Sequence, residues 1–190
     1  MDDSQQPPPR YLSLCAGYDG IGTALRRMLG PIEHVAFVER ESFVASLLIA
    51  QMENEASPLV PAPVWSDVRT FPYERFHGLV DVVSCGFPCQ PFSTCGKRGS
   101  TDDPRHIWPD ILRGIKELEA KWVILENVDG ILSAKSEGYH SAWHNVLCDL
   151  EEIGYATTWE SVSADEAGAP HQRKRVFGLA KLANGSCEFS

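Results

Sequence analysis

Long hydrophobic runs are missing from this sequence. No run approaches the ~20 apolar residues that cross a bilayer, and no apolar segment follows a basic one at the N-terminus. We therefore expect no transmembrane helix and no signal peptide. The 6 cysteines form no Cys-x-x-Cys pair, which makes a disulfide framework improbable in a chain of 190 residues. These absences favour a soluble, cytoplasmic protein.

Positive charge is scarce. The chain has 17 Lys and Arg residues against 26 Asp and Glu residues, a formal net charge of -9. This balance argues against a protein that coats nucleic acid through bulk positive charge, although it leaves room for a local basic cleft. The hydrophobic content of 43% and the charged content of 23% are typical of one globular domain.

Short apolar runs alternate with amphipathic stripes along the chain. We expect strands at residues 11–17, 34–39, 80–86, 122–127, 157–162 and 175–180. We expect helices at residues 21–29, 43–53, 107–118 and 143–153, and a proline-containing loop at 56–66. This alternation predicts an α/β domain with a largely parallel sheet over residues 11–190, after a disordered proline-rich tail at 1–10.

Polar segments follow several of these strands, where ligands bind in parallel sheets. Residues 17–22 form a glycine-rich turn with the spacing GxxGxG, which departs from the dinucleotide fingerprint GxGxxG and disfavours a nicotinamide cofactor. The turn either approaches a nucleotide-like ligand or is only a tight turn. Glu39 ends the second strand and could bind ribose hydroxyls, or be a solvated carboxylate; Asp67 has the same two interpretations.

The segment GFPCQPFS (86–93) is more specific. It holds Cys89 between Pro88 and Gln90, just beyond a buried strand, where a nucleophilic thiolate would be accessible. Cys85 lies inside that strand and is expected to be an inert core thiol. We assign no role to Cys95.

Two further segments carry candidate chemistry. Glu126 ends an apolar strand and is suited to proton donation, unless it caps a helix or forms a structural ion pair. The densest positive cluster, residues 171–175, could grip phosphate or orient a substrate, or could be a solvated surface patch. His140 and His144 have helical spacing but lack a third ligand, so we expect no metal site.

In order and spacing, these segments resemble the cytosine-5 DNA methyltransferase family. SLCAGYDGIG (13–22) resembles its first motif, and GFPCQPFS resembles its nucleophile motif almost letter for letter. Residues 126–128 (ENV) and PHQRKRVF (170–177) resemble its glutamate and arginine motifs. The resemblance covers roughly residues 11–180.

The resemblance implies a Rossmann-like, S-adenosylmethionine-dependent methyltransferase fold, with helices on both faces of the sheet. Its cofactor would be S-adenosylmethionine. The residues that the resemblance assigns to the cofactor are Cys15, Ala16, Gly17, Tyr18, Asp19, Gly20, Ile21, Glu39, Arg40, Asp67, Val68, Gly86 and Pro88. The family commonly has phenylalanine where Cys15 stands.

The resemblance also implies the reaction. Cys89 would attack carbon 6 of a cytosine flipped out of duplex DNA, Glu126 would act at ring nitrogen 3, and carbon 5 would take the methyl group. Arg173 and Arg175 would position the base and the cysteine loop. The implied substrate contacts are Gln90, Ser93, Lys97, Arg98 and Asn127.

In the family, a target-recognition region and two further motifs follow the arginine motif, and residues 182–190 resemble none of them. We therefore expect a catalytic domain that is C-terminally truncated relative to the family, or one half of a split enzyme with a separate target-recognition polypeptide. Two alternatives are an inactive or partner-dependent subunit that binds cofactor, and an RNA cytosine methyltransferase. Roles in restriction–modification, viral self-protection or solitary methylation are equally open.

Overall fold

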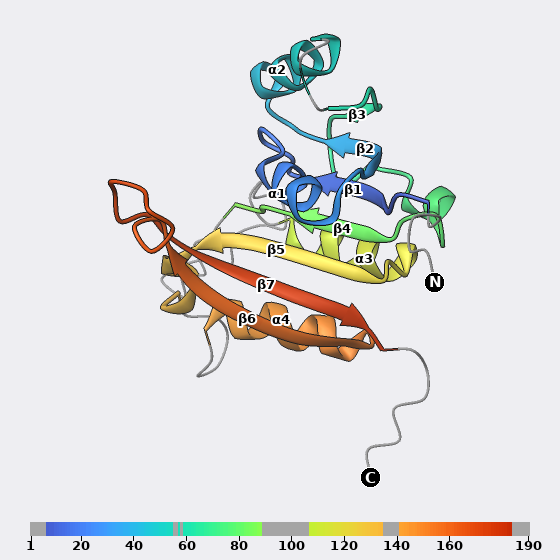
Figure 1. Cartoon of the computed structure of the whole chain (residues 1–190). Helices are drawn as coiled ribbons and strands as arrows, with labels where there is room; N and C mark the ends of the chain where they lie inside the picture. The colour runs from blue at the N-terminus through green and yellow to red at the C-terminus, as the bar shows by residue number, and fades with distance from the viewer. Residues whose placement is uncertain (1–6, 55–56, 58, 89–106, 135–140, 184–190) are drawn as a thin grey trace, which may run out of the picture.

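A computed structural model describes residues 7–54, 57, 59–88, 107–134 and 141–183. They form a seven-stranded sheet with the order β3-β2-β1-β4-β5-β7-β6 (Figure 1). The strands are β1 (Arg10–Leu14), β2 (Glu33–Val38), β3 (Val64–Trp65), β4 (Val82–Cys85), β5 (Trp122–Val128), β6 (Tyr155–Ser163) and β7 (Lys174–Leu182).

The sheet is mostly parallel, as the alternation of runs predicts. The strands from β1 to β5 pair in parallel. The last two strands differ, since β7 pairs antiparallel with both β5 and β6. No helix lies between β6 and β7, so the chain returns directly and these strands pair antiparallel.

The α-helices lie close to their expected positions. They are α1 (Gly20–Leu29), α2 (Ser42–Glu53), α3 (Trp108–Leu118) and α4 (Ala142–Glu152). Gly30 ends α1 with a φ of 86°, a conformation that glycine adopts readily. Short 3-10 helices lie at Tyr73–Phe76 and Asp129–Leu132. The expected loop at 56–66 contains the whole of the two-residue strand β3, because Phe37 and Val38 of β2 offer a free edge for pairing.

The helices cover both faces of the sheet. On one face, Leu12, Leu14 and Val83 join a large core with the apolar sides of α3 and α4. On the other face, Tyr11 and Val82 pack near α1, while α2 covers Phe37 through Leu48 and Met52. No helix among the described residues is long and apolar enough to cross a membrane.

Side chains along β1 point alternately into the large core and toward α1. Leu12 and Leu14 point into the large core, whereas Tyr11 and Ser13 face α1. Because β1, β2, β4 and β5 are parallel, their carboxyl ends meet at one edge of the sheet. The loops that leave this edge hold the polar segments of the sequence, and there the candidate site is found.

Candidate active site

The glycine-rich turn between β1 and α1 has an unusual backbone. Cys15, Gly17 and Asp19 have φ values of 49°, 55° and 54°, in the left-handed region that costs most side chains about 1–2 kcal/mol. The turn is fastened to β2, because the Ala16 N–H donates to the Val38 carbonyl at 3.1 Å and the Gly17 N–H donates to Glu39 Oε2 at 2.8 Å.

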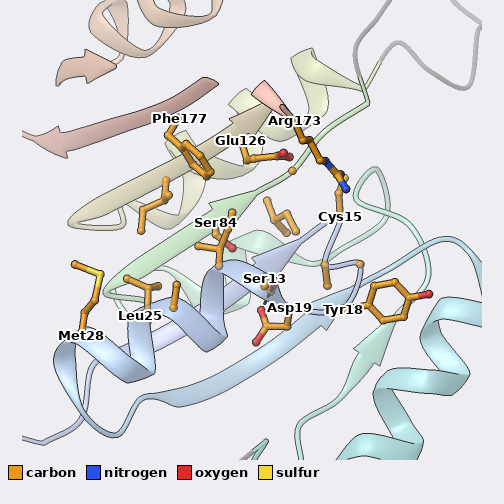
Figure 2. A pocket seen from close by; sticks show the side chains of 18 residues that line it. Ser13, Cys15, Tyr18, Asp19, Leu25, Met28, Ser84, Glu126, Arg173 and Phe177 are labelled. Atoms are coloured by element: carbon orange, nitrogen blue, oxygen red, sulfur yellow. Dashed lines mark hydrogen bonds between the residues drawn. The ribbon is translucent and has the colours of Figure 1, made fainter. Parts of the chain in front are cut away.

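Two cavities adjoin at this turn and share Cys15, Gly17 and Gly86. The first has a volume of about 630 Å³ and lies between α1 and the ends of β4, β5 and β7. Figure 2 shows it with Glu126 and Arg173 on one side and Asp19 and Ser13 on the other. The second, of about 680 Å³, lies between the turn and the loops after β2, β3 and β4. Each is large enough for a nucleoside-sized ligand.

Every residue that the resemblance assigns to the cofactor lines one of these cavities. Residues 15–21 line the first cavity. Glu39, Arg40, Asp67, Val68 and Pro88 line the second, and Gly86 lines both. Segments far apart in sequence therefore converge on one continuous surface at the edge of the sheet.

Glu126 and the two arginines come together at the rim of the first cavity. Arg175 Nε lies 2.7 Å from Glu126 Oε1, and both side chains are partly buried. The antiparallel pairing of β5 with β7 explains this contact, since it brings Arg175 opposite Val128, near Glu126. Arg173 also lines the cavity. Of the two sequence interpretations, the ion-paired glutamate is thus present, and its carboxylate still faces the cavity.

Asn127 holds the backbone at the start of the segment 86–93, and Gly86 in that segment lies beside Glu126. Asn127 is buried, and its Nδ2 donates to the Phe87 carbonyl at 2.9 Å, so its described contact is with the backbone before Pro88. A Cβ added to Gly86 would lie 3.4 Å from Glu126 Oε2. A larger residue at 86 would therefore take space beside the carboxylate.

Cys85 is fully buried at the end of β4, as expected. Burial raises the pKa of the Cys85 thiol well above its ordinary value, and the neighbouring Cys15 adds to that shift. A thiol with a raised pKa carries little thiolate, so Cys85 is unsuited to nucleophilic attack.

Part of the predicted site lies outside the described residues. Cys89, the predicted nucleophile, follows directly on Pro88 in the sequence. The other predicted residues outside the described ranges are Gln90, Ser93, Lys97 and Arg98. Their roles stay predictions, as does that of His140.

The first cavity also contains residues that the sequence analysis did not single out. Ser13 and Ser84 are cross-strand neighbours and line it together. Each is a polar residue within an apolar strand, and that was the available signal. Ile124, Phe177 and Met28 supply an apolar wall, for which the sequence carries no specific signal because such residues equally form cores.

The sequence model of the C-5 cytosine-specific DNA methylases matches residues 10–186, nearly the whole chain. The chain belongs to this family. Among its relatives, the Type II methyltransferase M.NgoMIV of Neisseria gonorrhoeae is 32% identical over 173 residues, which cover 89% of this chain and 50% of that protein. M.CviJI of Paramecium bursaria Chlorella virus IL3A is 34% identical over 172 residues, or 90% of this chain and 42% of that protein.

The fold has solved counterparts. The crystal structure of S. pombe Dnmt2 methyltransferase superposes with a TM-score of 0.73 at 22% identity, covering 94% of this chain and 52% of that one. This DNA methylase chain thus spans about half the length of the proteins it matches. The Rossmann-like methyltransferase fold expected from the resemblance is confirmed.

Membership of the family implies S-adenosylmethionine as the cofactor, and the described residues fit it. Glu39 directly follows β2, and one of its carboxylate oxygens accepts from the Gly17 N–H while the other accepts from the Glu41 N–H at 2.8 Å. Each oxygen keeps a lone pair, so the rigidly held carboxylate can accept from ribose hydroxyls in the second cavity.

Proposed function

We propose that this chain carries the catalytic centre of a DNA (cytosine-5-)-methyltransferase. The reaction transfers a methyl group from S-adenosylmethionine to carbon 5 of cytosine in DNA, through a covalent adduct of the base with Cys89. The observation that carries the proposal is the pairing of Glu126 with Arg175 at the rim of a cavity whose other wall is the glycine-rich turn.

The two cavities would hold different parts of the cofactor. The second cavity, with Glu39, Asp67 and Val68, takes the adenosine part of the cofactor, and residues 15–21 take its methionine part. When bound, S-adenosylmethionine supplies an electrophilic methyl group on its sulfonium. Gly86 adjoins both cavities and would hold the cofactor beside the segment that continues into Cys89.

The cytosine enters from the side of Glu126. Cys89 thiolate adds to carbon 6 while Glu126, as the carboxylic acid, donates its proton to ring nitrogen 3, so electron density shifts to carbon 5 and makes it nucleophilic. Carbon 5 then takes the methyl group, with S-adenosylhomocysteine as the leaving group. Return of the nitrogen 3 proton to Glu126, loss of the carbon 5 proton to water and departure of Cys89 as thiolate restore the aromatic ring. The base must leave the duplex stack to reach this place, which costs a few kcal/mol.

Arg175 and Asn127 act as positioning residues. The ion pair with Arg175 fixes the orientation of the Glu126 carboxylate. Without it, the Glu126 side chain could rotate about its bonds. Asn127 holds the Phe87 carbonyl and so fixes where the nucleophile segment begins. Arg173 contributes positive charge to the cavity wall, where it can contact the base or the phosphate beside it.

The test is transfer of labelled methyl from S-adenosylmethionine to mixed-sequence duplex DNA by the purified chain. Cys89→Ser is expected to abolish incorporation, because a hydroxyl is a far weaker nucleophile than a thiolate. The matched control is Cys95→Ser, which is expected to retain activity because Cys95 lies beyond the segment 86–93 and has no assigned role. Equal activity of the Cys89→Ser variant would contradict the nucleophile assignment.

A second set of reactions tests substrate and partner. Addition of a target-recognition polypeptide from the family is expected to raise methylation and make it sequence-specific. Uptake of methyl by RNA but not by DNA would instead favour an RNA methyltransferase. An absence of transfer to both nucleic acids, even with a recognition polypeptide present, would contradict the proposal.

A further inference from the structure

A buried polar cluster lies directly beneath the glycine-rich turn. Asp19 Oδ1 accepts hydrogen bonds from the hydroxyls of Tyr11, at 3.1 Å, and Ser13, at 3.0 Å. Asp19 Oδ2 lies 2.8 Å from His34 Nε2, and the side chains of both residues are fully buried. The Tyr11 hydroxyl also forms a short hydrogen bond with Ser84 Oγ, so the cluster joins the turn to β1, β2 and β4.

The position of His34 depends on an irregularity in β2. Tyr11 pairs with His34, but Leu12 pairs with Ala36, so β2 carries one extra residue between these pairs. The bulge places both His34 and Phe37 on the face that carries α1. Their rings stack with centroids 4.7 Å apart, and the Tyr11 ring meets the His34 ring edge-on at 5.0 Å. The imidazole is thereby fixed with Nε2 directed at Asp19.

The Asp19 carboxylate also packs closely against the start of α1. Asp19 is the residue before α1, in the left-handed conformation, yet its side chain caps no helical N–H. An added Cβ at Gly22 would overlap the Asp19 carboxylate, so glycine at 22 makes room for it. A buried carboxylate is costly unless its hydrogen bonds are satisfied, and here three side chains from two strands satisfy it.

We propose that the buried Asp19–His34 pair is a positioning device for the cofactor: it holds the turn at residues 15–19 in its left-handed conformation and so sets the affinity for S-adenosylmethionine. This inference rests on the proposed function. Asp19 acts through the backbone of the turn, since its side chain is fully buried and both oxygens accept hydrogen bonds within the protein. His34 is therefore a positioning residue for the site although it lines neither cavity.

The variants separate the carboxylate from the backbone conformation. Asp19→Gly keeps a residue that tolerates positive φ but removes the carboxylate. Asp19→Asn keeps the shape and one acceptor oxygen, and it guards against a failure of the glycine variant to fold. His34→Phe keeps an aromatic ring to stack on Phe37 but removes the donor. His77→Phe is the matched control, since His77 is exposed and lies away from the turn.

The first measurement is the affinity for S-adenosylmethionine, by calorimetry on the whole chain. We expect Asp19→Gly and His34→Phe each to weaken binding about tenfold or more, Asp19→Asn to weaken it less, and His77→Phe to leave it unchanged. Because the two residues act as one unit, the double variant is expected to lose no more than the weaker-binding single variant. Unchanged affinity, or losses that multiply, would overturn the proposal.

The second measurement needs no cofactor. Hydrogen exchange of the free chain is expected to quicken at the amides of residues 16–23 in the Asp19 and His34 variants, while α3 keeps its protection. A uniform increase over the whole chain would show a merely structural role and overturn the proposal. Failure of the unaltered chain to bind S-adenosylmethionine would refute the proposed function and the effect on affinity. The exchange pattern tests separately whether Asp19 and His34 hold the turn in its conformation.

Discussion

Two carboxylates line the same cavity in opposite ways. Asp19 is fully buried and accepts hydrogen bonds from neutral side chains of the neighbouring strands. Glu126 keeps 28% of its side chain exposed and, among the described residues, forms an ion pair with Arg175. Asp19 lies in the turn after β1 and Glu126 lies near the carboxyl end of β5, but of the two only Glu126 is exposed enough to meet a ligand.

The difference between Asp19 and Glu126 shows that burial and hydrogen-bonding partners decide what a carboxylate does in this fold. A carboxylate with every oxygen engaged stabilises a backbone conformation, and it is sensitive to any change in its neighbours. A carboxylate held by one ion pair at a cavity rim keeps a defined orientation together with access to substrate. The comparison predicts that changes around Glu126 act on turnover and that changes around Asp19 act on folding and on the turn.

The largest effect is expected from Glu126→Gln. We expect the methylation rate to fall about 100-fold or more, which corresponds to about 2.7 kcal/mol in the barrier, because the amide cannot donate the proton in the same way. The midpoint of urea unfolding and the affinity for S-adenosylmethionine are expected to stay close to those of the unaltered chain. Glu117→Gln is the control, since Glu117 is a similarly half-buried carboxylate on α3 that pairs with Arg113 away from the cavities. A loss confined to cofactor affinity would remove Glu126 from the catalytic role.

Gly22→Ala tests how tightly Asp19 is enclosed. The new methyl group would overlap the carboxylate, which has nowhere to move, so we expect a loss of about 2 kcal/mol in the free energy of unfolding. Gly20→Ala in the same helical turn is the control, since an added Cβ there meets nothing within 4 Å. Urea unfolding of both variants measures the difference, and equal stabilities would contradict the packing of Asp19 against Gly22.

Tyr11→Phe removes one donor from the Asp19 cluster while keeping the ring. Burial raises the pKa of Tyr11 far above its ordinary value, and the charge of Asp19 adds to the shift, so the hydroxyl stays protonated and available as a donor. We expect a loss of about 1–1.5 kcal/mol in the free energy of unfolding, with faster hydrogen exchange at the turn.

Tyr155→Phe is the matched control for this variant. The Tyr155 hydroxyl is also buried and donates to the Ala120 carbonyl at 2.8 Å, away from the cavities. It is expected to lower stability to a similar extent without affecting exchange at residues 16–23. The same exchange pattern in both variants would show that the tyrosine cluster has no special link to the turn.

The smallest effect is expected at a third carboxylate, Asp81, at the opposite edge of the sheet. Partial burial alone would raise its pKa, but hydrogen bonds from the Arg10 backbone and the side chains of Lys121 and Arg10 outweigh burial and lower it. A lowered pKa in the folded state means that Asp81 stabilises the protein above its unfolded pKa, and that this contribution disappears as the pH falls through the folded value.

Asp81→Asn is therefore expected to destabilise the chain by about 1 kcal/mol at neutral pH. The difference from the unaltered chain should shrink on acidification and vanish once Asp81 is protonated in both states. Urea unfolding as a function of pH measures it. A difference that persists unchanged in acid would show that the amide disturbs packing, and that the charge of Asp81 contributes nothing.

Local patterns were sufficient for much of the fold. The period-2 runs and the 3.6-residue stripes predicted β1, β2, β4 and β5 and the α-helices to within a few residues. The antiparallel return of β7 and the two-residue strand β3 were not predictable in this way. Both depend on which strand edge is free in the folded sheet, and that is a property of the assembled chain.

Motif order along the chain was enough to identify the family and the candidate residues that line the two cavities. The contacts of Glu126 with Arg175, of Asn127 with the Phe87 carbonyl and of His34 with Asp19 became apparent only in the folded chain. Motif spacing fixes which groups are available. Register, a bulge and burial fix which of them touch, because those contacts arise between residues that are distant along the chain.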